Sequence, residues 1–299
     1  MKVKRKKPAK YHLRKPVVTR LRTEDIVHIA AQLADYDKEL IAKTGFSLRG
    51  IACHAADVKE DDIKNLLKDI VVGVIPITSG KGVIGGFCNA VKSIVSHLGC
   101  RTFIPQATDV AGLAEAFEKK TDIIMLADDD RFVAIHIQGH RVIDNAVATA
   151  KGFVVGLNLM AKGLAGKNVL VIGCGSVGCA AAKALVTSGA RVSVHDNISS
   201  RCNGLAQAIR QSFNAEIQIA KELEPALTEH QFIVDATPAA DIIRANHITS
   251  DTYISAPGVP LGLNEAARAK VSDRLLHDSL QIGVATMTVG AMKFHLPQG

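Results

Sequence analysis

A glycine-rich segment at residues 168–178 has the residue types and the spacing of a dinucleotide-binding site. An apolar run that predicts a buried strand leads into Gly173, Gly175 and Gly178, spaced as G-x-G-x-x-G, and a helix-like stretch follows. The first glycine of this motif permits a tight turn, the second lets backbone amides approach a pyrophosphate, and the third lets the helix pack on the strand. The free amides at the helix N-terminus then favour the anion.

A carboxylate stands where such a site binds the adenosine ribose. The apolar run 190–195 predicts the next strand, which ends on Asp196, 23 residues beyond Gly173. A carboxylate there accepts hydrogen bonds from the ribose hydroxyls and repels a 2′-phosphate, so the sequence predicts NAD rather than NADP. Arg201 is close in sequence and would soften that preference.

Two later strand ends complete the predicted cofactor site. The runs 232–235 and 252–256 predict strands, and each is followed by a proline-containing turn at the end where open α/β sheets bind ligands. The residues expected to contact NAD are Gly173, Cys174, Gly175, Ser176, Val177, Gly178, Asp196, Ala236, Thr237, Pro238 and Pro257.

The order of the predicted elements indicates an α/β protein of two lobes, the second a Rossmann fold. Strands alternate with helices, which predicts parallel strands joined by right-handed crossovers. We expect a basic disordered tail at 1–22, an α/β substrate-binding and dimerisation domain at 23–147, and a Rossmann NAD-binding domain at 148–299.

The first lobe has a less regular pattern. Helical spacing after the N-cap Thr23 predicts one helix up to Gly45, and residues 46–70 predict a short strand and a polar helix. Further strands are expected at 71–77, 102–104, 122–126 and 132–137, the last two paired as a hairpin, and further helices at 83–98, 110–120, 148–162 and 283–294.

A glycine-rich loop, residues 78–82, follows the first strand of this lobe. A phosphate-binding P-loop requires Ser or Thr after Lys81 and a glycine at position 75, where the chain has Gly82 and Ile75. The sequence therefore excludes a P-loop ATPase. The segment is either a wall of a substrate cleft or a connecting turn.

Three consecutive aspartates, residues 128–130, end another predicted strand. Such a run most often forms a solvated turn. Ligands also bind at the carboxyl ends of strands, and Asp128 is the aspartate nearest to the strand, so it is the candidate to face a cleft.

Charge and composition limit the other functions of the chain. Residues 1–22 hold ten of the 36 Lys and Arg residues and no acid, which predicts a solvated tail, with binding to nucleic acid as the less favoured alternative. The most apolar stretch, 152–165, is too short to span a bilayer, and no secretory signal is evident. Six cysteines without zinc spacing predict reduced thiols, no metal and a cytoplasmic location.

Four motifs resemble those of the dehydrogenase family that completes pyrrolysine biosynthesis. They are Gly73–Phe87, Leu126–Asp129, Gly173–Gly178 and Ile282–Met287, within a resemblance that runs from about Leu21 to Ala291. The resemblance implies that NAD oxidises the terminal amine carbon of Nε-(3-methyl-D-ornithyl)-L-lysine to an imine. The imine hydrolyses with loss of ammonia, the pyrroline ring of L-pyrrolysine closes, and the enzyme is a homodimer.

The same resemblance implies residue roles. Asp128 and Asp278 would be the catalytic carboxylates, although the family carries a glutamate where this chain has Asp278. The implied substrate contacts are Leu21, Thr78, Ser79 and Asn145, with Leu21 and the first helix closing over the site.

Two other functions fit parts of the sequence. A dehydrogenase of the shikimate or methylenetetrahydrofolate type shares the two-lobed plan, but the lysine–aspartate or tyrosine–lysine patterns that it needs are not evident. An NAD-sensing regulator whose basic tail binds nucleic acid is the non-enzymatic alternative. Formation of NADH with an amine substrate would distinguish an enzyme from a sensor.

Overall fold

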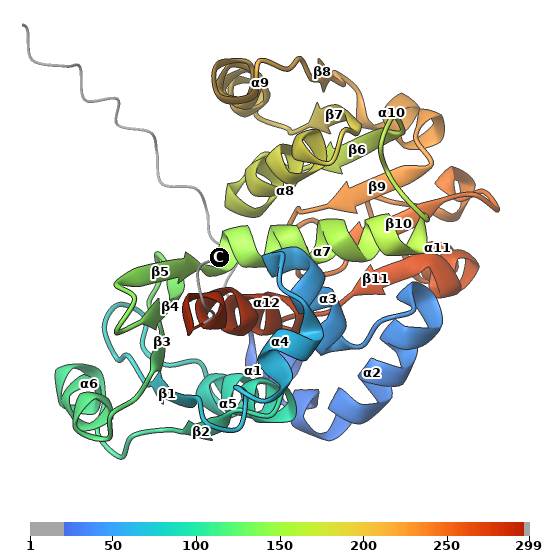
Figure 1. Ribbon diagram of the computed structural model, residues 1–299. Coiled ribbons are helices and arrows are strands. Elements are labelled where there is room, and N and C mark those ends of the chain that lie inside the picture. The colour runs from blue at the N-terminus through green and yellow to red at the C-terminus, as the bar shows by residue number, and fades with distance from the viewer. Residues whose placement is uncertain (1–20, 296–299) are drawn as a thin grey trace, which may run out of the picture.

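The N-terminal lobe of the computed structural model, which describes residues 21–295, is built on a five-stranded sheet in the order β2-β1-β3-β4-β5 (Figure 1). Its strands are β1 (Val71–Ile75), β2 (Arg101–Phe103), β3 (Ile123–Ala127), β4 (Phe132–His136) and β5 (Arg141–Asp144). The first three are parallel, while β4 and β5 pair antiparallel, so the predicted hairpin of β3 and β4 is confirmed.

Two helices cover opposite faces of this sheet. Alternate residues of β1 point to opposite sides, so Val74 packs in the main core while Ile75 packs in a smaller cluster with Ala116. α5 (Phe87–His97) covers the first side and α6 (Asp109–Glu118) covers the second.

The C-terminal lobe is a parallel sheet in the order β11-β10-β9-β6-β7-β8. Its strands are β6 (Asn168–Ile172), β7 (Arg191–His195), β8 (Gln218–Ile219), β9 (Phe232–Asp235), β10 (Tyr253–Ala256) and β11 (Leu275–His277), and its helices are α8 (Ser176–Thr187), α9 (Ser199–Phe213), α10 (Leu223–Glu229) and α11 (Glu265–Val271). This arrangement confirms the predicted Rossmann fold, in which the strand order reverses between β6 and β9.

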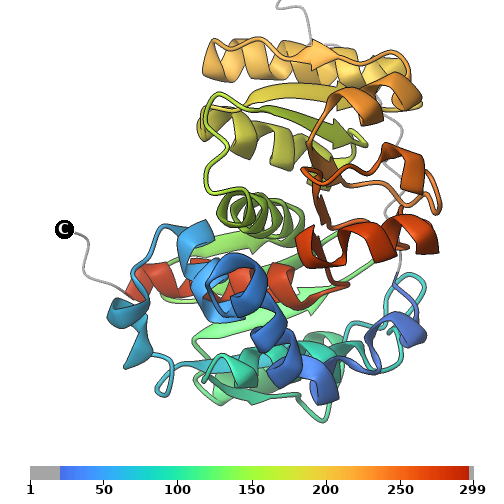
Figure 2. The ribbon, with the colours of Figure 1, turned by 90° about the vertical axis from the view of Figure 1, so that its right-hand side faces the viewer.

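Two long helices lie between the sheets (Figure 2). α7 (Asn145–Met160) crosses α12 (Gln281–Met292) closely, because a Cβ atom at Gly152 would lie 2.3 Å from Ile282 Cγ2. α12 is the last α-helix of the described residues, and it also packs on α3 (Leu48–Ala56) of the N-terminal lobe. The start of α12 is therefore held between both lobes.

Residues 21–70 differ from the prediction. The single predicted helix is two, α1 (Thr23–Ile26) and α2 (Ile29–Thr44), and the strand predicted within residues 46–70 is wrong. That segment forms α3, where the Ser47 hydroxyl accepts a hydrogen bond from Gly50 N at the helix start. It also forms α4 (Glu60–Lys64), which lies in the predicted polar helix. A short apolar run is equally compatible with a strand or a buried helix turn.

Three 3-10 turns complete the described chain: η1 (Ala245–His247), η2 (Ser272–Arg274) and η3 (Lys293–His295). Within residues 21–295, no helix is long and apolar enough to span a membrane. The predicted basic tail lies outside the described residues except for its last two positions.

Candidate active site

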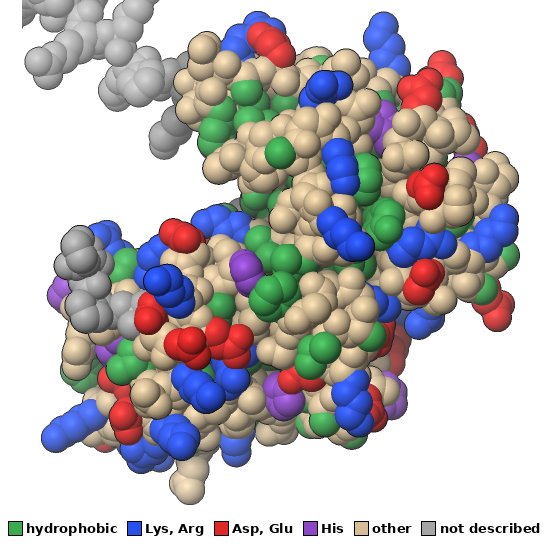
Figure 3. Space-filling model, turned by 45° about the vertical axis from the view of Figure 1, so that its right-hand side comes forward, with side chains coloured by type: hydrophobic (Ala, Val, Ile, Leu, Met, Phe, Trp, Pro, Cys, Tyr) green, Lys and Arg blue, Asp and Glu red, His purple; other side chains and the backbone are tan. Residues whose placement is uncertain are grey.

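A cavity of about 840 Å³ opens between the lobes, and Figure 3 shows the surface hollowed there. The C-terminal lobe contributes the ends of β6, β7, β9 and β10 to its wall. The N-terminal lobe contributes the acidic turn after β3 and the start of α7. One space therefore joins the nucleotide motif to three of the candidate substrate-side residues, Leu21, Asp128 and Asn145.

The glycine turn has the shape that a dinucleotide requires. Gly173 has a φ of 90°, and a Cβ atom there would lie 2.9 Å from Ala236 O. A Cβ atom at Gly178 would lie 1.8 Å from Gly173 O, so only glycine allows α8 to pack on β6. A Cβ atom at Gly175 would meet nothing within 4 Å, which leaves space for a pyrophosphate at the N-terminus of α8.

Asp196 is held rigidly at the end of β7. Its Oδ2 accepts a hydrogen bond from Cys174 N and its Oδ1 accepts one from Ile198 N, both at 2.8 Å. The Arg201 guanidinium lies 3.7 Å from Oδ2. All these groups except Cys174 line the cavity, so a fixed carboxylate faces the cavity where the sequence predicts the adenosine ribose.

Replacing Asp196 with Ala is expected to reduce the preference for NAD over NADP by about 10-fold or more, because the repulsion of a 2′-phosphate disappears while Arg201 remains. The measurement is the ratio of kcat/KM for the two cofactors. The control is Arg210→Ala. Arg210 lies on α9, as Arg201 does, but it pairs with Glu216 at the surface, so this variant should keep the wild-type ratio. A wild-type preference for NADP would contradict the assignment.

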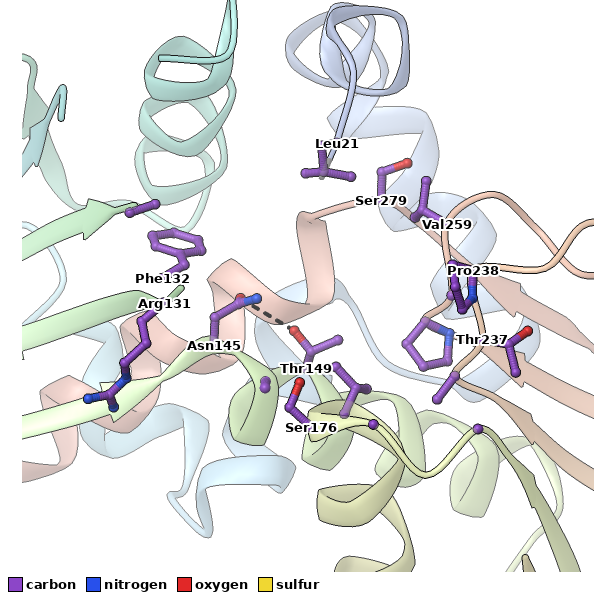
Figure 4. Close-up of a pocket in the computed structure, with 18 of the residues that line it drawn as sticks. Leu21, Arg131, Phe132, Asn145, Thr149, Ser176, Thr237, Pro238, Val259 and Ser279 are labelled. Atoms are coloured by element: carbon purple, nitrogen blue, oxygen red, sulfur yellow. Dashed lines mark hydrogen bonds between the residues drawn. The ribbon is translucent and has the colours of Figure 1, made fainter. Parts of the chain in front are cut away.

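The turns after β9 and β10 pack closely against each other at one wall of the cavity. Asp235 is fully buried, and its Oδ1 accepts hydrogen bonds from Thr237 N and Thr237 Oγ1 at 3.1 and 2.8 Å. A Cβ atom at Gly258 would lie 2.2 Å from Thr237 O. Ala236, Thr237, Pro238 and Pro257 all line the cavity, and Figure 4 shows Thr237 and Pro238.

Burial raises the pKa of Asp235 to about 6, against the opposing effect of its hydrogen bonds to Thr237. Because the unfolded value is about 3.9, the stability from this protonation is complete below pH 4 and is lost as the pH rises through 6. Asp235→Asn should remove roughly 3 kcal/mol of that pH dependence. The test is urea unfolding of both proteins between pH 4 and pH 8, and parallel curves would refute the prediction.

The exposed acidic turn is held by hydrogen bonds to backbone amides. Asp128 Oδ1 accepts hydrogen bonds from Asp130 N and Arg131 N, both at 2.8 Å. Asp129 Oδ2 accepts a hydrogen bond from Lys81 N at 2.9 Å, which joins the turn to the glycine-rich loop. All three aspartates line the cavity, so Asp128 lies where the sequence places a ligand-facing carboxylate.

Asn145 is the first residue of α7, and it lines the cavity together with Ser176 of the nucleotide turn (Figure 4). Thr149 Oγ1 donates a hydrogen bond to Asn145 Oδ1 at 3.3 Å, which orients the amide. A Cβ atom at Gly283 would lie 2.3 Å from that hydroxyl, so α12 confines the pair. Phe132 and Phe87 form an edge-to-face pair beside them, with centroids 5.2 Å apart.

Five of the predicted residues do not line the cavity. Thr78 is turned away because its N–H and its hydroxyl both donate to the Asp109 carboxylate, at 2.7 and 2.5 Å, and the exposed Ser79 follows it. Cys174 and Gly178 lie behind the turn that they shape. Asp278 is buried, and its Oδ2 accepts a hydrogen bond from Tyr36 Oη at 2.6 Å.

Other residues line the cavity without having been predicted. Beside the candidate substrate residues, these include Phe132, Thr149, Ser279 and Leu280. No local motif marks them, since they come from three separated segments that meet only in the folded chain. Among the described residues, no group of three or more His, Cys, Asp and Glu side chains lies where it could hold a metal ion.

Comparison with known families covers most of the chain. Residues 25–143 match the family described as Pyrrolysine biosynthesis protein PylD, N-terminal domain. Residues 145–254 match the S-adenosyl-L-homocysteine hydrolase, NAD binding domain. The chain is also 28% identical to the pyrrolysine synthases of Methanosarcina acetivorans and Methanosarcina barkeri, over 89% of this chain and 97% and 95% of theirs.

Solved structures share the fold. Quinate dehydrogenase from Corynebacterium glutamicum in complex with NAD has a TM-score of 0.53 at 18% identity, over 75% of this chain and 93% of that chain. Shikimate dehydrogenase from Aquifex aeolicus has a TM-score of 0.52 at 18% identity, over 75% and 91%. These similarities show the two-lobed fold alone.

The fold and the nucleotide site define a two-lobed oxidoreductase with NAD as its cofactor. Its N-terminal lobe is similar to the N-terminal domain of the pyrrolysine biosynthesis family, and the resemblance inferred from the sequence is confirmed.

Proposed function

We propose that this oxidoreductase uses NAD to oxidise the terminal amine carbon of Nε-(3-methyl-D-ornithyl)-L-lysine, with loss of ammonia and closure of the pyrroline ring of L-pyrrolysine. The observation that carries the proposal is the single cavity that joins the nucleotide turn of one lobe to Asp128 and Asn145 of the other. Its relatives named pyrrolysine synthase support the same reaction.

The chemistry requires a group that binds an ammonium and accepts its proton. A primary ammonium has a pKa of about 10.4, so it is protonated at neutral pH and cannot release a hydride from its carbon until it loses that proton. In the proposal Asp128 binds the ammonium and guides the proton away. NAD, when bound, supplies the hydride acceptor.

The remaining steps need no further protein group. The two-electron oxidation converts the CH–NH₃⁺ unit to an iminium with release of one proton. Water adds to the iminium and ammonia leaves, which gives an aldehyde. The substrate's own α-amine then condenses with the aldehyde and releases water as the ring forms.

The walls of the cavity fit a dipeptide-like substrate. The rings of Phe87 and Phe132 offer an apolar surface to a methylated aliphatic chain, and the Asn145 amide, oriented by Thr149, offers a polar contact beside it. Leu21 lies on the same side of the cavity as Ser279 and Val259, where it would cover the bound substrate (Figure 4).

The deciding experiment is mass spectrometry of the product formed from the methylornithyl-lysine dipeptide and NAD, with NADH absorbance followed in parallel. The expected product is L-pyrrolysine with one NADH per molecule. NADH formation with a different amine product would remove the assigned substrate but keep the reaction class. NAD binding without turnover would favour the sensor.

We also propose that the enzyme works in the cytoplasm as a homodimer. α6 supports an association surface, because Val110 and Phe117 on one of its faces are 80% and 63% exposed. Sedimentation of the full chain would test the oligomeric state.

A further inference from the structure

A buried hydrogen bond joins two residues that are 242 positions apart. Tyr36, in the middle of α2, is only 9% exposed, and its hydroxyl donates to Asp278 Oδ2 at 2.6 Å. Asp278, at the end of β11, is 6% exposed. Burial and the nearby Asp278 charge both raise the pKa of Tyr36, so its hydroxyl remains protonated and acts as a donor.

The Asp278 carboxylate also accepts hydrogen bonds from backbone amides at the start of α12. Its Oδ1 accepts a hydrogen bond from Leu280 N at 2.9 Å, and its Oδ2 accepts one from Ile282 N at 3.2 Å. Amide donors at a helix start stabilise a carboxylate, as in an N-cap. The segment between these amides contains Ser279 and Leu280, which line the cavity.

The helix that carries Tyr36 is joined through α1 to a residue that lines the cavity. α2 follows α1, and Leu21, just before α1, lines the cavity on the same side as Ser279. α2 is fastened to β11 at a second point, where Lys43 Nζ donates to Leu275 O at 2.7 Å. Of these two contacts, the Tyr36–Asp278 hydrogen bond is nearer in sequence to the cavity lining, because Asp278 directly precedes Ser279.

We propose that Tyr36 is a positioning residue for the substrate side of the cavity. Through Asp278 it sets the place of Ser279 and Leu280, and through α2 it sets the approach of Leu21. The effect of Tyr36 on turnover rests on the proposed function. Its effect on the order of Ser279 and Leu280 does not. This positioning role gives Asp278 a task that needs no contact with the substrate, which agrees with its burial outside the cavity lining.

The structural part is tested by hydrogen exchange of the full chain without substrate. Tyr36→Phe should speed the exchange of amides 280–284 by about five-fold, because one hydrogen bond to Asp278 is lost. Lys43→Met is the matched control, since it removes the other α2–β11 contact, and it should leave these amides unchanged. Equal exchange in Tyr36→Phe and wild type, or an equal increase in both variants, would overturn the proposal.

The functional part is tested on the same variants with the dipeptide and NAD. Tyr36→Phe should raise KM for the dipeptide about five-fold or more while the Kd of NAD stays at the wild-type value. Asp278→Asn should act in the same direction, and the double variant should be no worse than the more impaired single variant. If Tyr36→Phe lowered the Tm but left the KM for the dipeptide unchanged, the hydrogen bond would only stabilise the fold, and the functional part of the proposal would be refuted. A wild type that does not oxidise the dipeptide would refute the proposed function but leave the exchange result to decide the role of Tyr36.

Discussion

Asp128→Asn is expected to lower kcat for the amine substrate by about 100-fold or more and to leave the Kd of NAD unchanged. The asparagine keeps an oxygen that can accept from Asp130 N and Arg131 N, so the turn after β3 retains its shape. It loses the negative charge that would hold the ammonium and take its proton. General acid–base groups contribute typically 10²- to 10⁴-fold, which sets the size of the effect.

The measurement is steady-state turnover with the dipeptide, together with fluorescence titration of NADH. Glu118→Gln makes the same change of charge on the exposed face of α6, away from the cavity, and should keep wild-type kcat. An Asp128→Asn enzyme with full activity would show that another group handles the proton, and the role of Asp128 would have to be abandoned.

Gly175→Asp is expected to weaken NAD binding by at least about 100-fold, or about 3 kcal/mol, without unfolding the protein. A side chain at this position meets no protein atom within 4 Å, and the backbone φ of −77° suits any residue. The new carboxylate would therefore occupy the space of the pyrophosphate at the N-terminus of α8 and repel it.

The matched control is Gly204→Asp, which places the same side chain in open space on α9, outside the cavity lining. Both variants should keep a Tm near that of the wild type, and only Gly175→Asp should lose NAD binding in calorimetric titration. Wild-type affinity in Gly175→Asp would mean that the pyrophosphate lies elsewhere.

The two variants separate the two halves of the site. Gly175→Asp removes the cofactor, whereas Asp128→Asn leaves the cofactor bound and removes the proposed chemistry. An intermediate result, in which Asp128→Asn also weakens NAD, would show that the acidic turn contacts the nucleotide.

The nucleotide lobe was predictable because its information is local. A buried parallel strand is a short apolar run, and the strands expected at 232–235 and 252–256 are observed as Phe232–Asp235 and Tyr253–Ala256. The glycine spacing and Asp196 lie within a few residues of the strand ends that position them. The segment at 46–70 was not predictable in the same way, because burial against α7 and α12 decides that α3 is a helix.

By itself the sequence determined the two-lobed α/β class, the NAD site, the family resemblance and the placing of Asp128 at a strand end. Each depends on residues near one another in the chain, where backbone sterics and burial act directly. Only the tertiary structure decided that Thr78 turns to Asp109 and that Asp278 is bound by Tyr36 instead of lining the cavity. Hydrogen bonds between segments that are distant in sequence determine the direction of these polar side chains. The spacing of residues within one segment therefore cannot predict it.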